Sequence, residues 1–189
     1  MAILKIARMG HPVLRKPAEP VENPTSPEVR ALVKDMIATM IDANGAGLAA
    51  PQIHESKRVV IFQAPASRMT PGVDEDEAYD HQAELTVLIN PEIEVLGPET
   101  EEGWEGCLSV PGMRGLVPRY THIRYRGVGL DGEPIERVAR GFHARVVQHE
   151  CDHLDGILYP QRMADLSKLI FETEAVHWVA PARGEDEER

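Results

Sequence analysis

The chain has 189 residues, of which 42% are hydrophobic and 27% charged, and its formal net charge is −11. This composition predicts one soluble globular domain with its own core. The negative charge argues against a nucleic-acid surface, which needs clustered basic residues, and no apolar run is long enough to span a membrane. Two cysteines do not form a disulfide framework and no secretory signal is visible, so we expect a cytoplasmic protein.

The first strong helix signal follows an irregular proline-containing arm. Apolar residues within 29–41 recur at the spacing of an amphipathic helix. Ser26 suits the N-cap and Pro27 the first helical position, whereas Asn44 and Gly45 are typical of a helix end. This pattern predicts a helix packed against the core.

The middle of the chain predicts strands, because it is rich in β-branched residues separated by turn signals. Asp131-Gly132 is a two-residue hairpin signal. Residues 64–83 combine prolines, a glycine and many acids and predict a long loop. The predicted strands cover residues 58–62, 85–90, 92–96, 117–128 and 135–139.

Two further helices are predicted, over residues 141–154 and 164–176. Strands in the middle with helices before and after indicate an α+β fold. We expect a compact single domain over residues 1–180, with antiparallel or mixed sheets packed around the helix at 141–154 and with an N-terminal and a C-terminal helix. The acidic residues 181–189 are expected to form a disordered tail.

The central helix carries His149-Glu150-x-x-His153. Positions i and i+4 lie on the same helix face, so the two imidazoles can point at one metal ion. Glu150 follows directly and can handle a proton of a water on that metal. The alternative is a helix that carries two surface histidines by chance.

Cys107 is the best candidate for a third ligand. Downstream of His153, Asp155 is too close on the same helix, and the remaining acids and His177 stand at unspecific spacings. A thiolate binds zinc or ferrous iron strongly, and two histidines with one cysteine leave a fourth position open, as catalytic sites do. The alternative for Cys107 is a small buried hydrophobe. Cys151 lies about 200° around the helix from His149 and is predicted to be packing.

The chain contains the motifs GAGLAAPQ at 45–52, EGCLS at 105–109 and QHECDH at 148–153. In this order along the chain, the three motifs resemble the signatures of peptide deformylase of the bacterial type 1. The resemblance extends from the N-terminus to about Met163. It implies an enzyme that removes the N-formyl group from the initiator methionine of newly synthesised proteins and releases formate.

The resemblance also implies a metal centre and a proton shuttle. Cys107, His149 and His153 would hold one divalent ion, which is Fe²⁺ in native family enzymes, with zinc, nickel or cobalt as substitutes. Glu150 would take a proton from the metal-bound water that attacks the formyl carbon and would pass it to the leaving amine.

Two loops upstream of the helix would complete the catalytic site. The Gln52 side-chain amide and the Leu108 backbone N–H would stabilise the negative charge that grows on the formyl oxygen. The Gly47 backbone would hydrogen-bond the main chain of the substrate.

The methionine side chain of the substrate needs an apolar pocket. Phe142 and Val146 precede His149 by seven and three residues and therefore share its helix face. We predict that they line this pocket, with Arg145 and His143 near its rim. Ala46 stands where relatives often carry a larger aliphatic residue. The substrate-binding set also includes Arg114, from the stretch that follows the second motif.

A further hypothesis pairs Arg119 with Asp152 in support of the helix that carries the two histidines. The expected partners are N-formylmethionyl nascent polypeptides and, transiently, the ribosome, with no nucleic-acid or membrane binding by the chain itself, which would be a monomer or weak dimer. The main alternative is an HExxH metallopeptidase. A non-catalytic, metal-stabilised binding protein is the second alternative, but such a protein would need neither Glu150 nor Gln52.

Overall fold

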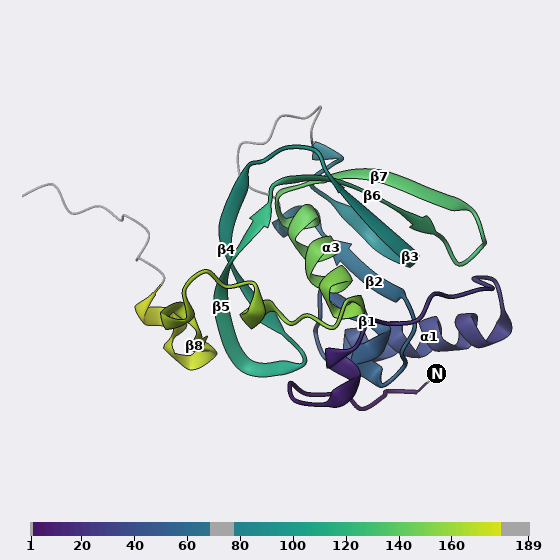
Figure 1. The fold of residues 1–189 in the computed structure, drawn as a ribbon, viewed down its shortest axis with the longest axis horizontal. Coiled ribbons are helices and arrows are strands. Elements are labelled where there is room, and N and C mark those ends of the chain that lie inside the picture. Colours follow the sequence, from purple (N-terminus) through teal and green to yellow (C-terminus); the bar gives the residue numbers. More distant parts are fainter. Residues whose placement is uncertain (1, 69–77, 179–189) are drawn as a thin grey trace, which may run out of the picture.

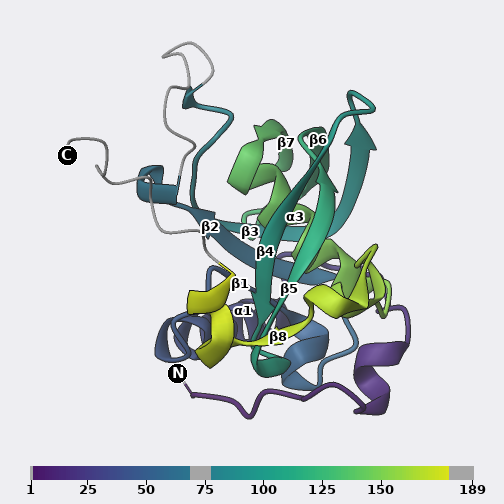
Figure 2. The same cartoon turned by 90° about the vertical axis from the view of Figure 1, so that its left-hand side faces the viewer.

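A computed structural model describes residues 2–68 and 78–178 of the chain. In this part, two antiparallel sheets enclose the helix α3 (Gly141–Leu154), as Figures 1 and 2 show. One sheet has the order β1-β2-β3-β6-β7 and the other the order β4-β5-β8. The strands are β1 (Gly47–Ala49), β2 (Val59–Ala64), β3 (Ala83–Val95), β4 (Thr100–Cys107), β5 (Val110–Tyr120), β6 (His122–Val128), β7 (Pro134–Arg140) and β8 (Ile170–Phe171).

The N-terminal helix α1 (Pro27–Asp42) forms as predicted. The Ser26 hydroxyl accepts a hydrogen bond from the Val29 N–H, which caps the first turn. The apolar stripe of α1 packs with β1 and β2 in one core cluster. A short 3₁₀ helix at Pro12–Arg15 lies in the N-terminal arm, and another at Ala50–Ile53 forms the loop after β1.

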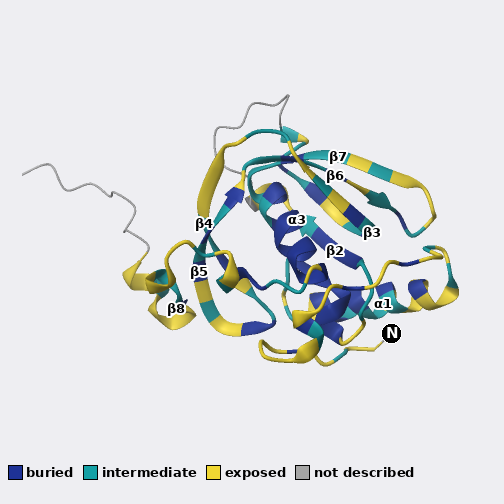
Figure 3. Cartoon of the chain, in the orientation of Figure 1, coloured by how far each residue is buried: buried dark blue, intermediate teal, exposed yellow. Residues whose placement is uncertain are grey.

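The central helix α3 has the predicted bounds. Ala144, Val147, Cys151 and Leu154 pack against the five-stranded sheet in a second core cluster. Figure 3 shows most of α3 buried between the sheets. The helix is also covered on the side that faces away from the five-stranded sheet. Its polar residues on that side must therefore find hydrogen-bond partners within the protein.

The strand predictions were wrong in several places, and β1 was not predicted at all. β3 continues through Pro91, because Asn90 adopts a φ of 50° and a bulge between Ile89 and Glu92 absorbs the missing N–H. The single strand predicted at 117–128 is two strands, β5 and β6, which belong to different sheets. β4 was missed because its acidic residues favour a loop. The hairpin around Asp131-Gly132 is confirmed, since β6 pairs with β7, but its connection spans residues 129–133 rather than the two residues predicted.

The C-terminal helical segment is broken into pieces. Instead of one helix at 164–176, the chain forms 3₁₀ helices at Leu166–Lys168 and Glu172–His177, with β8 between them. β8 pairs with β5, so tertiary pairing overrides the local helix preference. The 3₁₀ helices Ala66–Arg68 and Tyr159–Gln161 complete the described elements. Residues 69–77 of the predicted loop and the tail 181–189 lie outside the described residues. Among the described helices, none is long and apolar enough to cross a membrane.

Candidate active site

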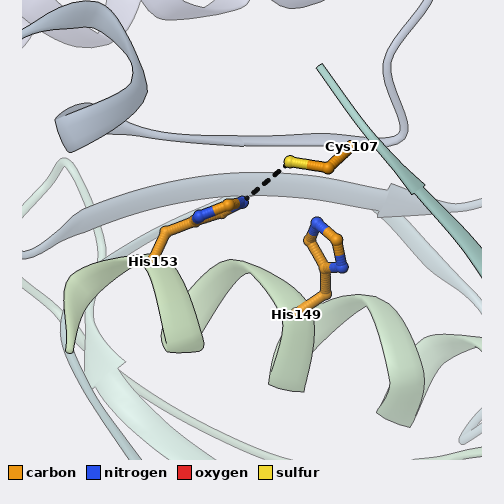
Figure 4. A group of neighbouring side chains, drawn as sticks. All are labelled: Cys107, His149 and His153. Carbon is orange, nitrogen blue, oxygen red and sulfur yellow. Dashed lines mark hydrogen bonds between the residues drawn. The ribbon is translucent and has the colours of Figure 1, made fainter. Parts of the chain in front are cut away.

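The structure brings the three predicted metal ligands together. His149 and His153 project from α3, Cys107 ends β4, and the three side chains point toward one another (Figure 4). The Cys107 Sγ lies 3.4 Å from the His153 Nε2. One ligand atom of each residue lies within 4.8 Å of the other two. A thiol and two imidazoles at this spacing fit a divalent transition metal such as zinc or ferrous iron.

The thiol of Cys107 favours its ionised form. Burial alone would raise its pKa, but His153 and His149 lower the pKa well below its usual range. Since the thiolate is the form that binds metals, this environment suits a ligand. Cys151 is the opposite case: burial in the apolar core raises the pKa of its thiol. The packing role predicted for Cys151 is confirmed.

Glu105 orients His149, a role that was not predicted from the sequence. Its Oε2 accepts a hydrogen bond from the His149 Nδ1 at 2.8 Å. A carboxylate has no proton to donate, so the Nδ1 carries the hydrogen and the Nε2 is left to bind a metal. Burial opposes ionisation of Glu105, yet His149 and Arg119 lower its pKa to about 2.

Arg119 connects this carboxylate to the helix. Its Nε and Nη2 donate to the two carboxylate oxygens of Glu105 at 2.9 and 3.0 Å. Its Nη1 donates to the Asp152 Oδ2 at 2.6 Å, which confirms the predicted Arg119–Asp152 pair. Arg162 adds two further hydrogen bonds to Asp152. Buried charges are costly unless paired, and here each one is paired.

Glu150 is buried beside the ligands and has a perturbed pKa. Within the described residues its Oε2 has no hydrogen-bond partner. Burial raises the pKa of its carboxyl to about 7, although the neighbouring His149 and His153 oppose the shift. A carboxyl group with a pKa near neutral can both accept and release a proton, as general acid–base catalysis requires. A Cβ on Gly47 would overlap this carboxylate, so glycine permits the approach.

Gln52 is held in a fixed orientation next to Cys107. Its Oε1 accepts from the Ala49 N–H at 2.9 Å, so its Nε2 must point the other way. The Nε2 donates to the Ser109 hydroxyl at 3.1 Å and lies 3.6 Å from the Cys107 Sγ. The Gln52 amide is therefore a preorganised N–H donor next to the three candidate metal ligands.

A cavity of about 520 Å³ opens onto these residues. His153 lies behind its wall and is almost fully buried. Trp104, Glu105, Met113, Arg145 and Glu172 also contribute to the lining. The predicted site residues that line it are Ala46, Gly47, Gln52, Cys107, Leu108, Arg114, Phe142, Val146, His149 and Glu150.

His143 does not lie near the rim, contrary to the prediction. It is fully buried, and its ring nitrogens lie 2.8 Å from the Asp80 carbonyl oxygen and 3.3 Å from the Tyr125 hydroxyl. Six residues before His149 correspond to about 240° around an α-helix, which turns the side chain toward the five-stranded sheet.

Residues 3–169 match the family model described as polypeptide deformylase. The chain belongs to this family. The family's members are hydrolases that remove the N-formyl group from nascent peptides, and they are metalloenzymes.

Individual relatives agree over almost the whole length. The chain is 50% identical to "Peptide deformylase 2" of Ralstonia nicotianae over 186 residues, which cover 97% of this chain and 99% of that protein. It resembles the crystal structure of peptide deformylase from Ehrlichia chaffeensis with a TM-score of 0.80 and 31% identity, over 88% and 91% of the two chains. The class I type b enzyme of Acinetobacter baumannii, determined with Met-Ala-Ser bound, is 39% identical with a TM-score of 0.74, over 86% and 99%.

Proposed function

We propose that this protein removes the formyl group from the N-terminal formyl-methionine of newly synthesised proteins and releases formate. The observation that carries the proposal is the ligand set. Cys107 from β4, rather than a residue downstream of α3, stands against His149 and His153. This set distinguishes the site from that of an HExxH peptidase, whose third ligand comes from the chain after the motif.

Cys107, His149 and His153 would hold one divalent ion, Fe²⁺ by the family resemblance. When bound, the ion would lower the pKa of a water molecule and polarise the formyl carbonyl. Glu105 supports this role, because it fixes the tautomer of His149.

Glu150 would serve as the general base and then as the general acid. Its carboxylate accepts a proton from the attacking water as the oxygen bonds to the formyl carbon. It then donates that proton to the amine nitrogen as the carbon–nitrogen bond breaks, so that formate and a free amino terminus leave. The burial of Glu150 and its pKa of about 7 support this double role.

Gln52 and Leu108 would stabilise the oxyanion. The Gln52 Nε2 and the Leu108 backbone N–H are the proposed donors. The bond from the Ala49 N–H to the Gln52 Oε1 supports the role of Gln52, since it holds the amide nitrogen on the side of Cys107. The Gly47 backbone would bind the substrate's main chain.

The methionine side chain would occupy the cavity beside the metal group. Phe142, Val146 and Ala46 supply apolar wall, and all three belong to or pack against the core cluster around α3. Arg114 would contact the peptide further from the formyl group. Its guanidinium is about half exposed and is paired with Glu172 at the cavity edge.

The cellular setting follows from the proposed substrate. Formylated chains emerge from the ribosome, so we propose that the protein acts in the cytoplasm, transiently close to ribosomes, as a monomer or weak dimer.

Formate release from formyl-Met-Ala-Ser tests the function. The protein is purified without oxygen and its metal content is assayed alongside. We expect stoichiometric formate and free Met-Ala-Ser, and no hydrolysis of acetyl-Met-Ala-Ser at a comparable rate. Cleavage of unformylated Met-Ala-Ser, or no formate from metal-loaded protein, would contradict the proposal.

A further inference from the structure

Arg145 reaches from α3 across to the β4–β5 hairpin. Its Nη1 donates to the Val117 carbonyl oxygen at 2.8 Å and lies 3.4 Å from that of Gly103, and its Nη2 donates to the Glu101 carbonyl oxygen at 2.7 Å. The same Nη1 lies 3.0 Å from the Glu105 Oε1. The side chain is only 14% exposed. Its bonds to Val117 and Glu105 are partly buried, whereas the bond to the Glu101 carbonyl oxygen is exposed.

Arg145 occupies the last acceptor position of the Glu105 carboxylate. The Oε1 receives the Arg119 Nε and the Arg145 Nη1, whereas the Oε2 receives the Arg119 Nη2 and the His149 Nδ1. A carboxylate has about four lone-pair directions, and here all four are used. The group that orients His149 is therefore fixed from two sides by two arginines.

Gly103 provides the space for this guanidinium. It pairs with Val117 in the β4–β5 ladder, and its φ lies outside the left-handed region, so the backbone itself does not require glycine. A Cβ at this position would lie 2.6 Å from the Arg145 Cζ and 2.7 Å from its Nη2. Any other residue at 103 would force the guanidinium to shift from this position.

We propose that Arg145 is a positioning residue of the metal centre and that Gly103 is required because Arg145 lies on it. Arg145 acts through Glu105, which it holds in the plane that orients His149. This inference rests on one part of the proposed function, namely that Cys107, His149 and His153 bind a metal. It concerns the affinity of the protein for that metal.

Metal retention is the readout, because a residue that only stabilises the fold would not change it selectively. The cobalt-loaded holoprotein is challenged with a chelator, for Arg145→Met and for Gly103→Ala. The methionine keeps an unbranched stem without the donors. Replacing a group that is hydrogen-bonded directly to a metal ligand typically weakens metal binding ten- to hundredfold. Arg145 lies one contact further out, beyond Glu105, so we expect a loss near the lower end of this range, about tenfold, in each variant. Arg145→Lys, which keeps one charged donor, should fall between Arg145→Met and the parent.

The double variant tests whether Gly103 affects metal binding through Arg145. If Gly103 acts only through Arg145, Gly103→Ala combined with Arg145→Met should lose no more affinity than Arg145→Met alone. Additive losses, or unchanged retention in Gly103→Ala, would overturn the proposal. Gly97→Ala is the matched control, since its added Cβ would meet only the side chain of the exposed Glu99 and should leave retention unchanged.

Two further measurements keep the outcomes separate. The midpoint of thermal unfolding of the metal-free variants shows whether the fold is kept. A loss of retention that scales with the loss of that midpoint, and that Gly97→Ala reproduces, would overturn the positioning role. Formate release is assayed independently, so absent activity with normal cobalt binding would contradict the proposed function and leave this inference standing.

Discussion

The two faces of α3 are about equally buried but have opposite chemistry. Ala144, Val147 and Leu154 face the five-stranded sheet and belong to the core cluster of apolar side chains there. His149 and Asp152 face the hairpin of β4 and β5 and are bonded to Glu105 and Arg119. Burial alone therefore does not separate core from active site. The difference lies in whether the opposing strands supply charged partners.

The two cysteines show the difference between the two faces most clearly. Cys151 belongs to the apolar face, and burial raises the pKa of its thiol. Cys107 opposes the polar face, and the histidines lower the pKa of its thiol despite burial. The same side chain is thus a packing residue in one place and a proposed metal ligand in the other.

Removing each thiol in turn should have opposite effects on metal content and activity, and this is the largest difference that we expect between the two faces. Cys107→Ala is expected to lose the metal and to reduce kcat/KM for formyl-Met-Ala-Ser about a thousandfold or more, because a bound metal supplies several kcal/mol of catalysis. Cys151→Ala is the matched control and should keep both metal and activity. Metal analysis of the two purified variants with a formate assay tests this pair, and a Cys107→Ala protein that keeps its metal would refute the ligand assignment.

Glu150→Gln should separate catalysis from metal binding on the polar face. The amide keeps the shape of the side chain but cannot accept the proton, so kcat should fall about 10²- to 10⁴-fold. The metal content should stay at the parent level. Asp155→Asn, at the exposed end of the same helix, is the control. Normal turnover in Glu150→Gln would remove this residue from the mechanism.

The polar face could be predicted well from the sequence, for a physical reason. An i, i+4 pair on a helix places two candidate ligands on one face from local geometry alone, and the affinity of a thiolate for zinc or ferrous iron suggested Cys107 as the third. Glu105 was missed as the partner of His149, because the sequence alone does not show which residues of a neighbouring strand face the helix. A signal was present, since Glu105 stands two residues before Cys107 on the same strand.

Non-local pairing accounts for what could not be predicted. β4 is acidic, yet it forms because β5 pairs with it along its whole length. The C-terminal segment has helical spacing, yet Ile170 and Phe171 add a strand to β5. His143 is buried by the sheet that crosses behind it, and a rim position inferred from the helix alone could not include that sheet.

On the apolar face, a core truncation should affect stability and spare the chemistry. Leu154→Ala is expected to lower the free energy of unfolding by about 2–5 kcal/mol, because the fully buried side chain leaves a cavity. Denaturant unfolding of the holoprotein measures this change. Activity per folded molecule should stay within about twofold. A large fall in kcat at a temperature where the variant is folded would show that the two faces are not separable.

His143 should make stability depend on pH in a defined direction. Burial lowers its pKa to about 4 from its ordinary value of 6.5, so the folded protein favours the neutral ring. The stabilisation is complete above pH 6.5 and is lost as the pH falls toward 4, by up to about 1.4 kcal/mol per pH unit. His143→Gln should reduce this slope. Because both proteins share the metal centre, identical slopes would mean that His143 is not the titrating group.

Phe142 should show the smallest effect, confined to substrate binding. Phe142→Ala removes apolar wall from the cavity and should raise KM for formyl-Met peptides roughly tenfold, with kcat changed much less, since losing pocket contacts costs about 1–3 kcal/mol. Steady-state kinetics with formyl-Met-Ala-Ser measures it. An unchanged KM would exclude Phe142 from the methionine pocket.

A metal titration tests the central claim most directly. Metal-free protein is titrated with cobalt under anaerobic conditions while formate release from formyl-Met-Ala-Ser is followed. Activity should rise linearly and stop at one equivalent, together with a thiolate-to-cobalt absorption band that is absent in Cys107→Ala and present in Cys151→Ala. Formate release without metal, or full activity with no thiolate band, would contradict a catalytic centre built from Cys107, His149 and His153.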